Sequence, residues 1–418
     1  MSSLDWHHER SPAFHLEAPE PAAAEAIDEV ALRAWRQTRL RQEMAARDID
    51  ALILMDPVNI RYATGARNMQ VFSMRNGPSR YLLMSAERSI LYEFTGALHL
   101  ADGLETIDEV RPAVTASFVA AGPHIAERER TWARDMASTL RAMVGTARPR
   151  VGVERMNAGT ALALADAGVT LLDAQAAVEM ARAIKSAEEV QCIIASLRAT
   201  ERAVAALEAA IRPGQTEAEL WSVLHQSVIA QNGDYVETRL LNSGPRTNPW
   251  FQETSARVIG ANELIALDTD VVGCHGYYSD FSRTFHAGPQ APTPAQRTLY
   301  QVAHEQVQHN LSLLRPGLSF RDYAEAAWDI PARYHAHRYY LSAHGCGMTG
   351  EYPYLYHRAD FPDAGYDGEI QPGMTLCVES FIGEADGGEG VKLEQQVLIT
   401  EDGVQLLSEY PFDAALLA

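Results

Sequence analysis

The stretch that decides the fold is LIALDTDVVGCHGYYSDFSRTF, residues 264–285. Asp268 and Asp270 close an apolar run, and Asp280 follows ten residues after Asp270. An interval of that size, with two glycines near its middle, is typical of a hairpin that returns the second strand beside the first. The sequence therefore predicts neighbouring strands whose three carboxylates meet at one point.

Three more titratable side chains interrupt apolar segments nearer the C-terminus. His344 lies in SAHGCGMTG, Glu379 in PGMTLCVES and Glu394 in GVKLEQQVLIT. A carboxylate among apolar neighbours on a strand is costly unless a cation compensates it. Oxygen ligands with a single imidazole suit a pair of first-row divalent ions such as Fe, Mn, Co, Ni or Zn. The pattern therefore predicts a dinuclear metal site.

Each of these residues also has an ordinary structural interpretation. Asp268 can end a strand at a turn, and the imidazole can be a hydrogen-bonded core histidine. Asp280 can pair with Arg283, and Glu379 can pair with Lys392. The metal interpretation is favoured because it accounts for all of the residues together.

The composition is that of a soluble globular chain. At 418 residues, with 47% hydrophobic and 22% charged residues, the chain is long enough for two domains. Its formal charge of −20 repels phosphate backbones and anionic lipid, which argues against nucleic acid or a membrane surface as a partner. The four cysteines form no CxxC pair, and neither a secretory signal nor a membrane span is visible. We therefore expect a cytoplasmic protein.

The chain changes character twice. Residues 1–25 are polar and rich in Pro, Ala and Glu, which predicts a flexible N-terminal arm. Residues 26–184 alternate helical patterns with short apolar runs, which predicts an α/β domain with a mixed sheet. Residues 185–418 begin with a long amphipathic helix and form the second domain. In that domain IRPGQT and LRPGLS each separate two helical patterns, which suggests a duplicated helix pair.

Several motifs resemble the pita-bread family of methionine aminopeptidases, prolidases and creatinases. The motifs are GYYSDFSRTF, AHGCGM, PGMTLCVES and KLEQQVLITEDG, with RAIKSAEEV opening the second domain. The resemblance implies an α/β (α+β) chain with a creatinase-like N-terminal domain and a C-terminal pita-bread metalloenzyme domain. It also implies a homodimer and a centre of two divalent metal ions, with five ligands that match Asp270, Asp280, His344, Glu379 and Glu394.

Within the family the chain resembles the DddP-type dimethylsulfoniopropionate lyases. The segments that carry this resemblance are DPVNIRYATGARNMQ, ETRLLNSGPRTNPWFQE, LDTD and TEDGVQLLSEYPFDAAL. In that group the extra acid that matches Asp268 is a sixth metal ligand. The resemblance implies β-elimination of a small zwitterion to acrylate and dimethyl sulfide, with iron or another transition metal.

Aromatic side chains suit the sulfonium of such a substrate, because ring faces attract cations. The expected substrate-binding residues are Trp250, Tyr277, Tyr352 and Tyr354. The resemblance adds Tyr62, reaching the site of a partner subunit, and Tyr339, which matches a tyrosine of the lyase pocket; its neighbour Tyr340 is an alternative. A tyrosine acts as a base only beside a metal or another cation, because its phenol has a pKa of about 10 in water.

Two departures from the family pattern bear on the chemistry. The lyases carry an acid as the base six residues after the histidine ligand, where this chain has Gly350. Glu351, Tyr339 or a metal-bound hydroxide must then take the proton, or the substrate differs. The peptidases carry a histidine where this chain has Glu351, and another before the first Asp ligand, where this chain has none. A dinuclear hydrolase of a dipeptide or small amide is the main alternative, and a non-catalytic binding protein is the other.

Overall fold

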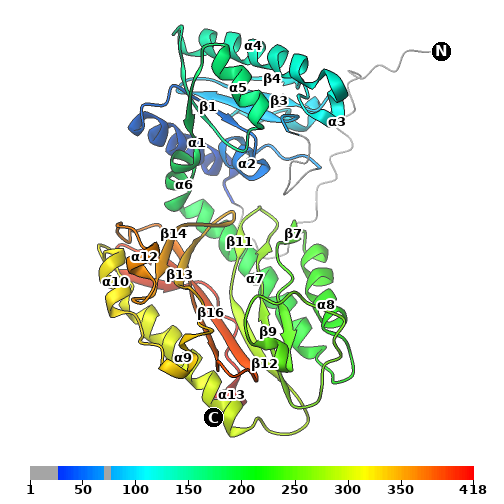
Figure 1. The fold of residues 1–418 in the computed structure, drawn as a ribbon, viewed down its shortest axis with the longest axis vertical. Helices are drawn as coiled ribbons and strands as arrows, with labels where there is room; N and C mark the ends of the chain where they lie inside the picture. The colour runs from blue at the N-terminus through cyan, green and yellow to red at the C-terminus, as the bar shows by residue number, and fades with distance from the viewer. Residues whose placement is uncertain (1–26, 70–76) are drawn as a thin grey trace, which may run out of the picture. The chain divides into compact units, whose positions relative to one another are not determined.

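The computed structural model describes residues 27–69 and 77–418, which form two compact units (Figure 1). Within the described residues, the N-terminal unit runs from Asp28 to Arg182 and the C-terminal unit from Ala183 to Ala418. The arm expected at residues 1–25 lies outside the described residues. No helix in the described part of the chain is long and apolar enough to cross a membrane.

The N-terminal unit is built on a six-stranded mixed sheet with the order β4-β3-β2-β1-β5-β6. Its middle strand β1 pairs antiparallel with β2 and parallel with β5. The strands are β1 (Ala51–Leu54), β2 (Tyr81–Ser85), β3 (Ser89–Glu93), β4 (Glu109–Pro112), β5 (Arg150–Val153) and β6 (Thr170–Asp173). The helices are α1 (Glu29–Ala46), α2 (Pro57–Thr64), α3 (Phe118–Ala121), α4 (Ile125–Val144), α5 (Ala158–Asp166) and α6 (Gln175–Ala183), with short 3₁₀ turns at Leu98–Ala101 and Gly122–His124.

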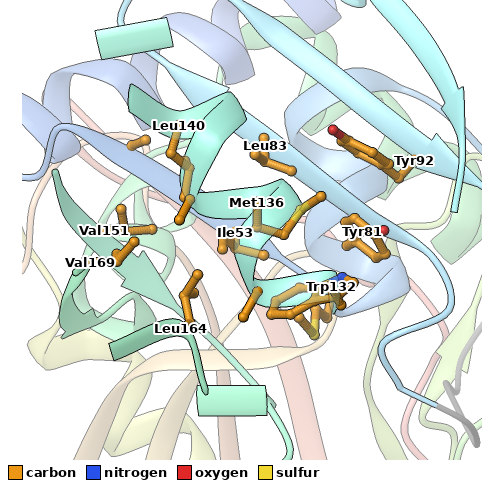
Figure 2. Close-up of a cluster of buried hydrophobic side chains, with 14 of the residues drawn as sticks. Ile53, Tyr81, Leu83, Tyr92, Trp132, Met136, Leu140, Val151, Leu164 and Val169 are labelled. Carbon is orange, nitrogen blue, oxygen red and sulfur yellow. The ribbon is translucent and has the colours of Figure 1, made fainter. Parts of the chain in front are cut away.

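The core of this unit lies between the sheet and α4. Figure 2 shows Trp132, Met136 and Leu140 of α4 facing Ile53 and Leu83 of the sheet. Residues four apart lie on one face of a helix, and all five side chains are fully buried. Each contributes roughly 1.5–3 kcal/mol by burial. This apolar stripe therefore holds α4 against the sheet.

The C-terminal unit contains three sheets, with α7 and α8 on one side and α9 and α10 on the other (Figure 1). The sheet orders are β14-β13-β15-β16-β17, β12-β9-β8 and β11-β10-β7. The strands are β7 (Tyr235–Val236), β8 (Leu241–Ser243), β9 (Glu263–Asp268), β10 (Val271–Val272), β11 (Tyr278–Ser279), β12 (Ser282–Ala287), β13 (Leu341–Cys346), β14 (Gly350–Tyr356), β15 (Thr375–Gly383), β16 (Gly390–Thr400) and β17 (Gly403–Leu406). The helices are α7 (Ala187–Ala209), α8 (Glu217–Ala230), α9 (Pro294–Leu313), α10 (Phe320–Ala326), α11 (Ala332–His335), α12 (Phe361–Ala364) and α13 (Ala414–Leu417), with a 3₁₀ turn at Gly244–Thr247.

The two helix pairs α7–α8 and α9–α10 are joined in the same way. Gly214 and Gly317 have positive φ angles of 98° and 79°, a conformation that favours glycine after a helix. Thr216 and Ser319 then cap the next helix, and each also forms an isolated antiparallel bridge with a later segment. These shared features confirm the repeat predicted from IRPGQT and LRPGLS.

Candidate metal centre

The hairpin predicted from residues 264–285 places the three aspartates. β9 pairs with β12 so that Asp268 lies opposite Ser282, and the short strands β10 and β11 continue the hairpin beyond it. Asp270 lies between β9 and β10 with a φ of 41°, which is uncommon for a residue other than glycine. Its carboxylate accepts hydrogen bonds from the hydroxyls of Tyr278, at 2.9 Å, and Thr238. These two bonds fix the direction of the Asp270 side chain.

The central strands of the five-stranded sheet supply the histidine and the glutamates. Glu379 on β15 lies directly opposite Glu394 on β16, so both side chains project from the same face of the sheet. The Nε2 atom of His344 lies 3.3 Å from Glu394 Oε1, 3.6 Å from Asp280 Oδ2 and 3.7 Å from Glu379 Oε1. The hairpin and the sheet therefore meet around His344.

The possible ligand atoms form two overlapping groups, and within each group they all lie within 4.8 Å of one another. Asp280 belongs to both groups, so its carboxylate could contact an ion held by either group. One group is Asp268, Asp270 and Asp280, and the other is Asp280, His344, Cys377 and Glu394. Cys377 is a member that we did not predict; its thiol donates to the backbone oxygen of Asp280 at 3.6 Å.

Unsatisfied oxygens show that the residues fit metal ions. Asp280 Oδ1, Glu379 Oε1 and Glu394 Oε1 are buried and have no hydrogen-bond partner. Leaving a buried polar atom unpaired costs about 1–3 kcal/mol, and more for a charged group. A divalent cation bound beside His344 would compensate all three oxygens at once.

Lys392 is a buried cation within the same cluster. Its Nζ lies 2.9 Å from Glu379 Oε2, 3.1 Å from Glu394 Oε2 and 3.5 Å from Asp268 Oδ2. Each glutamate thus offers one oxygen to Lys392, and its other oxygen faces His344 Nε2, at 3.3 Å for Glu394 and 3.7 Å for Glu379. The ion pair between Lys392 and Glu379 was the ordinary interpretation of the sequence, and the structure shows that it coexists with the cluster.

Charge counting also supports two divalent ions. Five carboxylates and one ammonium leave four negative charges, which is the charge that two divalent cations neutralise.

The ion pair between Asp280 and Arg283, the other ordinary interpretation of the sequence, is absent, since Arg283 donates to carbonyl oxygens and to Gln395 and not to Asp280.

The pKa values of the cluster reflect its crowding in the metal-free protein. Burial, reinforced by the charge of Asp268, raises the pKa of Asp270 to about 8. Burial raises the pKa of Glu379 to about 7, although Lys392 opposes this rise. Burial also raises the pKa of Asp280 well above its ordinary value, with a further contribution from Glu394. These carboxyl groups therefore hold protons that bound cations would displace.

Two of the expected aromatic residues lie beside Lys392. The Nζ of Lys392 is 5.2 Å from the ring centre of Tyr339 and 5.9 Å from that of Trp250. Tyr354 lies beyond the histidine, with its ring centre 6.5 Å from that of His344. The structure therefore brings Trp250, Tyr339 and Tyr354 to the cluster.

Glu351, predicted as a candidate base, lies elsewhere. Its Oε1 accepts a hydrogen bond from Lys185 at 2.5 Å, and both side chains are almost fully buried. On β14 it pairs with Gly345, the neighbour of His344, and adjacent residues on a strand face opposite sides. The Glu351 side chain therefore points away from the face that carries His344, and we correct its assignment from a base to an ion-pair partner.

The remaining predicted tyrosines have packing contacts. Tyr277 is 1% exposed and donates to Glu189 at 2.7 Å, which ties the hairpin to α7. Tyr352 packs against Phe320 and Tyr366. Tyr62 lies on α2 of the N-terminal unit, where it is 1% exposed and donates to the Ala181 carbonyl at 2.9 Å. None of these contacts supports substrate binding, and the proposed reach of Tyr62 into a partner's site stays a prediction.

Two comparisons with known families agree with this geometry. Residues 191–401 match the metallopeptidase family M24, and residues 36–184 match the Creatinase/Prolidase N-terminal domain. The fold is similar to that of an Xaa-Pro dipeptidase from Bacillus anthracis, with a TM-score of 0.71 over 91% of this chain and 99% of that chain, at 21% identity.

Two curated relatives are similar along the whole chain. The dimethylsulfoniopropionate lyase DddP of Roseovarius nubinhibens is 34% identical over 392 residues, which cover 92% of this chain and 87% of that protein. The DddP of Roseobacter denitrificans is 33% identical over 430 residues, covering 100% of this chain and 91% of that protein. The chain therefore belongs to the M24 family with a creatinase-type N-terminal domain and, within that family, to the group of the DddP dimethylsulfoniopropionate lyases.

Proposed function

We propose that this chain is a metal-dependent lyase that cleaves dimethylsulfoniopropionate, or a similar small sulfonium zwitterion, to acrylate and dimethyl sulfide. The observation that carries the proposal is the position of Asp268. Its carboxylate lies within the cluster, where it accepts from Ser282 at 2.7 Å and faces Lys392. This fifth carboxylate is one of the features by which the sequence resembles the lyases, whose two curated relatives match 92% and 100% of the chain.

The reaction needs a base for the α-proton, and Tyr339 is the side chain that we assign. Its phenolate oxygen must take the proton from the α-carbon while the electron pair of that C–H bond forms the new double bond and the bond from the β-carbon to sulfur breaks. Dimethyl sulfide leaves with the sulfur electron pair. Bound divalent ions supply the Lewis acidity that makes the α-proton more acidic.

The environment of Tyr339 explains why a cation is needed. Burial and the nearby Glu379 raise the pKa of this phenol far above its ordinary value, while Lys392 lowers it. Lys392 alone leaves the phenol protonated in the metal-free protein. Positive charge added at the carboxylate cluster would lower the pKa of Tyr339 further, in the direction that a base requires.

The finer properties of the centre are also proposals. We propose two divalent ions, with iron in the native enzyme, as the resemblance to the lyases implies. Imidazole and carboxylate ligands suit Fe, and they equally suit Mn, Co, Ni or Zn. We further propose a cytoplasmic homodimer, as the family resemblance implies.

Hydrolysis of a dipeptide is the competing function. The position that holds a histidine in the peptidases is Glu351 here, and Glu351 is held in an ion pair with Lys185. The side chain therefore does not lie where it would assist a tetrahedral intermediate at the cluster. This observation favours elimination over amide hydrolysis.

A paired assay tests the proposal. The metal-loaded enzyme is incubated with dimethylsulfoniopropionate, and headspace dimethyl sulfide is measured beside hydrolysis of an Xaa-Pro dipeptide. We expect release of dimethyl sulfide and no hydrolysis. Dipeptide hydrolysis without release of dimethyl sulfide, at full metal loading, would contradict the lyase proposal and favour the hydrolase function.

Two variants test the assignment of the base. Tyr339→Phe should lower kcat at least about 100-fold, the low end of a general base's contribution. A Cβ atom added at Gly350 would meet no atom within 4 Å, and the backbone there does not have a positive φ, so Gly350→Asp should fold and raise the rate of dimethyl sulfide release. If Tyr339→Phe retains the wild-type rate, another group takes the proton.

A further inference from the structure

The aromatic residues around the metal cluster fall into two sets, of which one already contacts a cation of the protein and the other, among the residues that the structure describes, does not. The first set is Trp250 and Tyr339, whose rings both lie within 6 Å of Lys392 Nζ. Trp250 also stacks on Phe381, and Tyr339 contacts Phe251 at a ring-centre distance of 5.2 Å. These rings are therefore already packed around a cation that belongs to the protein.

Lys392 cannot easily be displaced from this position. Its side chain is fully buried and held by Glu379, Glu394 and Ser282 at distances of 2.9–3.1 Å. Removing one partner of such a buried charge network is strongly destabilising, because it leaves the other charge buried and uncompensated. A second cation placed against the same rings would meet Lys392 as a like charge, which disfavours binding there.

The second set is Tyr340 and Tyr354, and it has no internal cation in the described structure. The two rings lie 6.5 Å apart at an angle of 71°, so their planes form a corner. Tyr340 is 44% exposed and Tyr354 is 39% exposed, in contrast to 7% for Trp250. The corner is therefore open to an incoming ligand.

The corner is also adjacent to the metal cluster. The ring of Tyr354 lies 6.5 Å from that of His344, and Tyr340 stacks on Tyr339 with ring centres 5.0 Å apart. A ligand whose carboxylate reaches the cluster past these residues would carry its other end toward the two rings. In dimethylsulfoniopropionate, two methylene groups separate the carboxylate from the sulfonium.

We propose that Tyr340 and Tyr354 form the wall that receives the methylated onium group of the substrate, and that Lys392 excludes this group from Trp250 and Tyr339. This inference rests on the proposed function for the choice of substrate, and it assigns specificity to a residue pair on one side of the centre. Tyr340 is thus a specificity residue, and Trp250 supports the internal cation.

A pair of isosteric ligands tests the wall without turnover. One is 3-(trimethylammonio)propanoate and the other is 4,4-dimethylpentanoate, which has the same shape but no positive charge. Calorimetry on the metal-loaded enzyme gives the ratio of their affinities. Tyr340→Leu and Tyr354→Leu should each reduce this ratio about 2- to 30-fold, the range of one cation–π contact. Tyr340→Phe and Tyr354→Phe keep the ring and should keep the ratio.

The contrasting variant is Trp250→Leu, which should weaken both ligands equally. A ratio that falls in Trp250→Leu and not in the Tyr340 and Tyr354 variants would overturn the proposal, as would a wild-type ratio near one. Thermal unfolding of each variant shows whether it is folded. Release of dimethyl sulfide is measured separately, so a wild-type preference for the onium ligand without lyase activity would support the wall while contradicting the proposed reaction.

Discussion

Buried carboxylates occur in both units of the molecule, and the difference lies in their partners. In the N-terminal unit, Glu93 accepts hydrogen bonds from the side chain of Arg80 at 2.7 Å, from the side chain of Asn68 at 3.1 Å and from the backbone amide of Phe94 at 2.9 Å. Glu154 accepts from two backbone amides, both at 3.0 Å, and from an asparagine side chain at 2.7 Å. Both oxygens of each glutamate are therefore satisfied by the protein.

In the C-terminal unit, the cluster around His344 has unsatisfied oxygens on Asp280, Glu379 and Glu394. A buried carboxylate whose oxygens all have donors needs no further partner, whereas one with a free oxygen needs a ligand. The contrast teaches that burial of charge alone does not mark a functional site. Unsatisfied atoms that converge do mark one.

The largest effect should follow from removing Asp280, the carboxylate that belongs to both groups of possible ligands. Loss of a residue that only hydrogen-bonds to a metal ligand typically lowers metal affinity or activity about 10- to 100-fold. Asp280→Asn should lower metal affinity by more than this, and it should abolish activity. Because burial raises the pKa of Asp280, this group must take up a proton when the metal-free protein folds; asparagine removes that cost, so the melting temperature of the metal-free protein should rise. Metal analysis and thermal unfolding with and without metal measure both effects.

The matched control is Asp268→Asn, because Asp268 is already paired with Lys392 and Ser282. Burial raises the pKa of Asp268 as well, but Lys392 opposes the rise, so this variant should raise the melting temperature of the metal-free protein less than Asp280→Asn does. Wild-type metal content in Asp280→Asn would show that Asp280 is not a ligand.

A smaller effect is expected on the unfolding free energy when Glu351, a buried carboxylate paired with Lys185, loses its charge. Glu351→Gln leaves the ammonium of Lys185 buried without a counter-charge, which should cost about 3–5 kcal/mol of unfolding free energy. We expect kcat to change less than tenfold, because Glu351 faces away from the cluster. Urea unfolding and the dimethyl sulfide assay give the two values.

Replacing both partners, as Lys185→Met with Glu351→Leu, should recover most of the lost stability, since no buried charge then remains unpaired. A large loss of kcat in Glu351→Gln at unchanged stability would return Glu351 to the role of base.

Much of the cluster could be predicted because it depends on short-range patterns. The interval from Asp270 to Asp280 specifies a hairpin, and the apolar runs around Glu379 and Glu394 specify adjacent strands. The family resemblance added the order of the ligands. These signals lie within a few residues of each ligand, so one sequence contains them.

The partners of the cluster were harder to predict because they depend on long-range packing. Lys392 lies two residues before Glu394, on the same face of its strand, but we considered Lys392 only as a possible partner of Glu379. The partner of Glu351 is 166 residues away in the sequence, and no local pattern connects it with Lys185. Only the structure identified this partner.

The smallest effect concerns pH and a carboxylate that is fully satisfied. Burial raises the pKa of Glu154 from 4.5 to about 7, although its hydrogen bonds from Asp56 and Asn59 oppose the rise. Between these two values the folded protein binds more protons at this group than the unfolded chain. The unfolding free energy should therefore fall as the pH rises from about 4.5 to 7, by up to about 3 kcal/mol.

Glu154→Gln isolates this contribution, because glutamine stays neutral at every pH. Near pH 5 the two proteins should be similarly stable, since Glu154 is then mostly protonated in the folded state. At pH 8 the glutamine variant should be the more stable by up to about 3 kcal/mol. Urea unfolding of both proteins at the two pH values gives the difference, in which the titration of the metal cluster cancels. If the unfolding free energies of the two proteins changed with pH in the same way, the three hydrogen-bond donors would outweigh burial and keep Glu154 ionised. The satisfied carboxylates of the N-terminal unit would then differ from those of the metal cluster in charge as well as in hydrogen-bond partners.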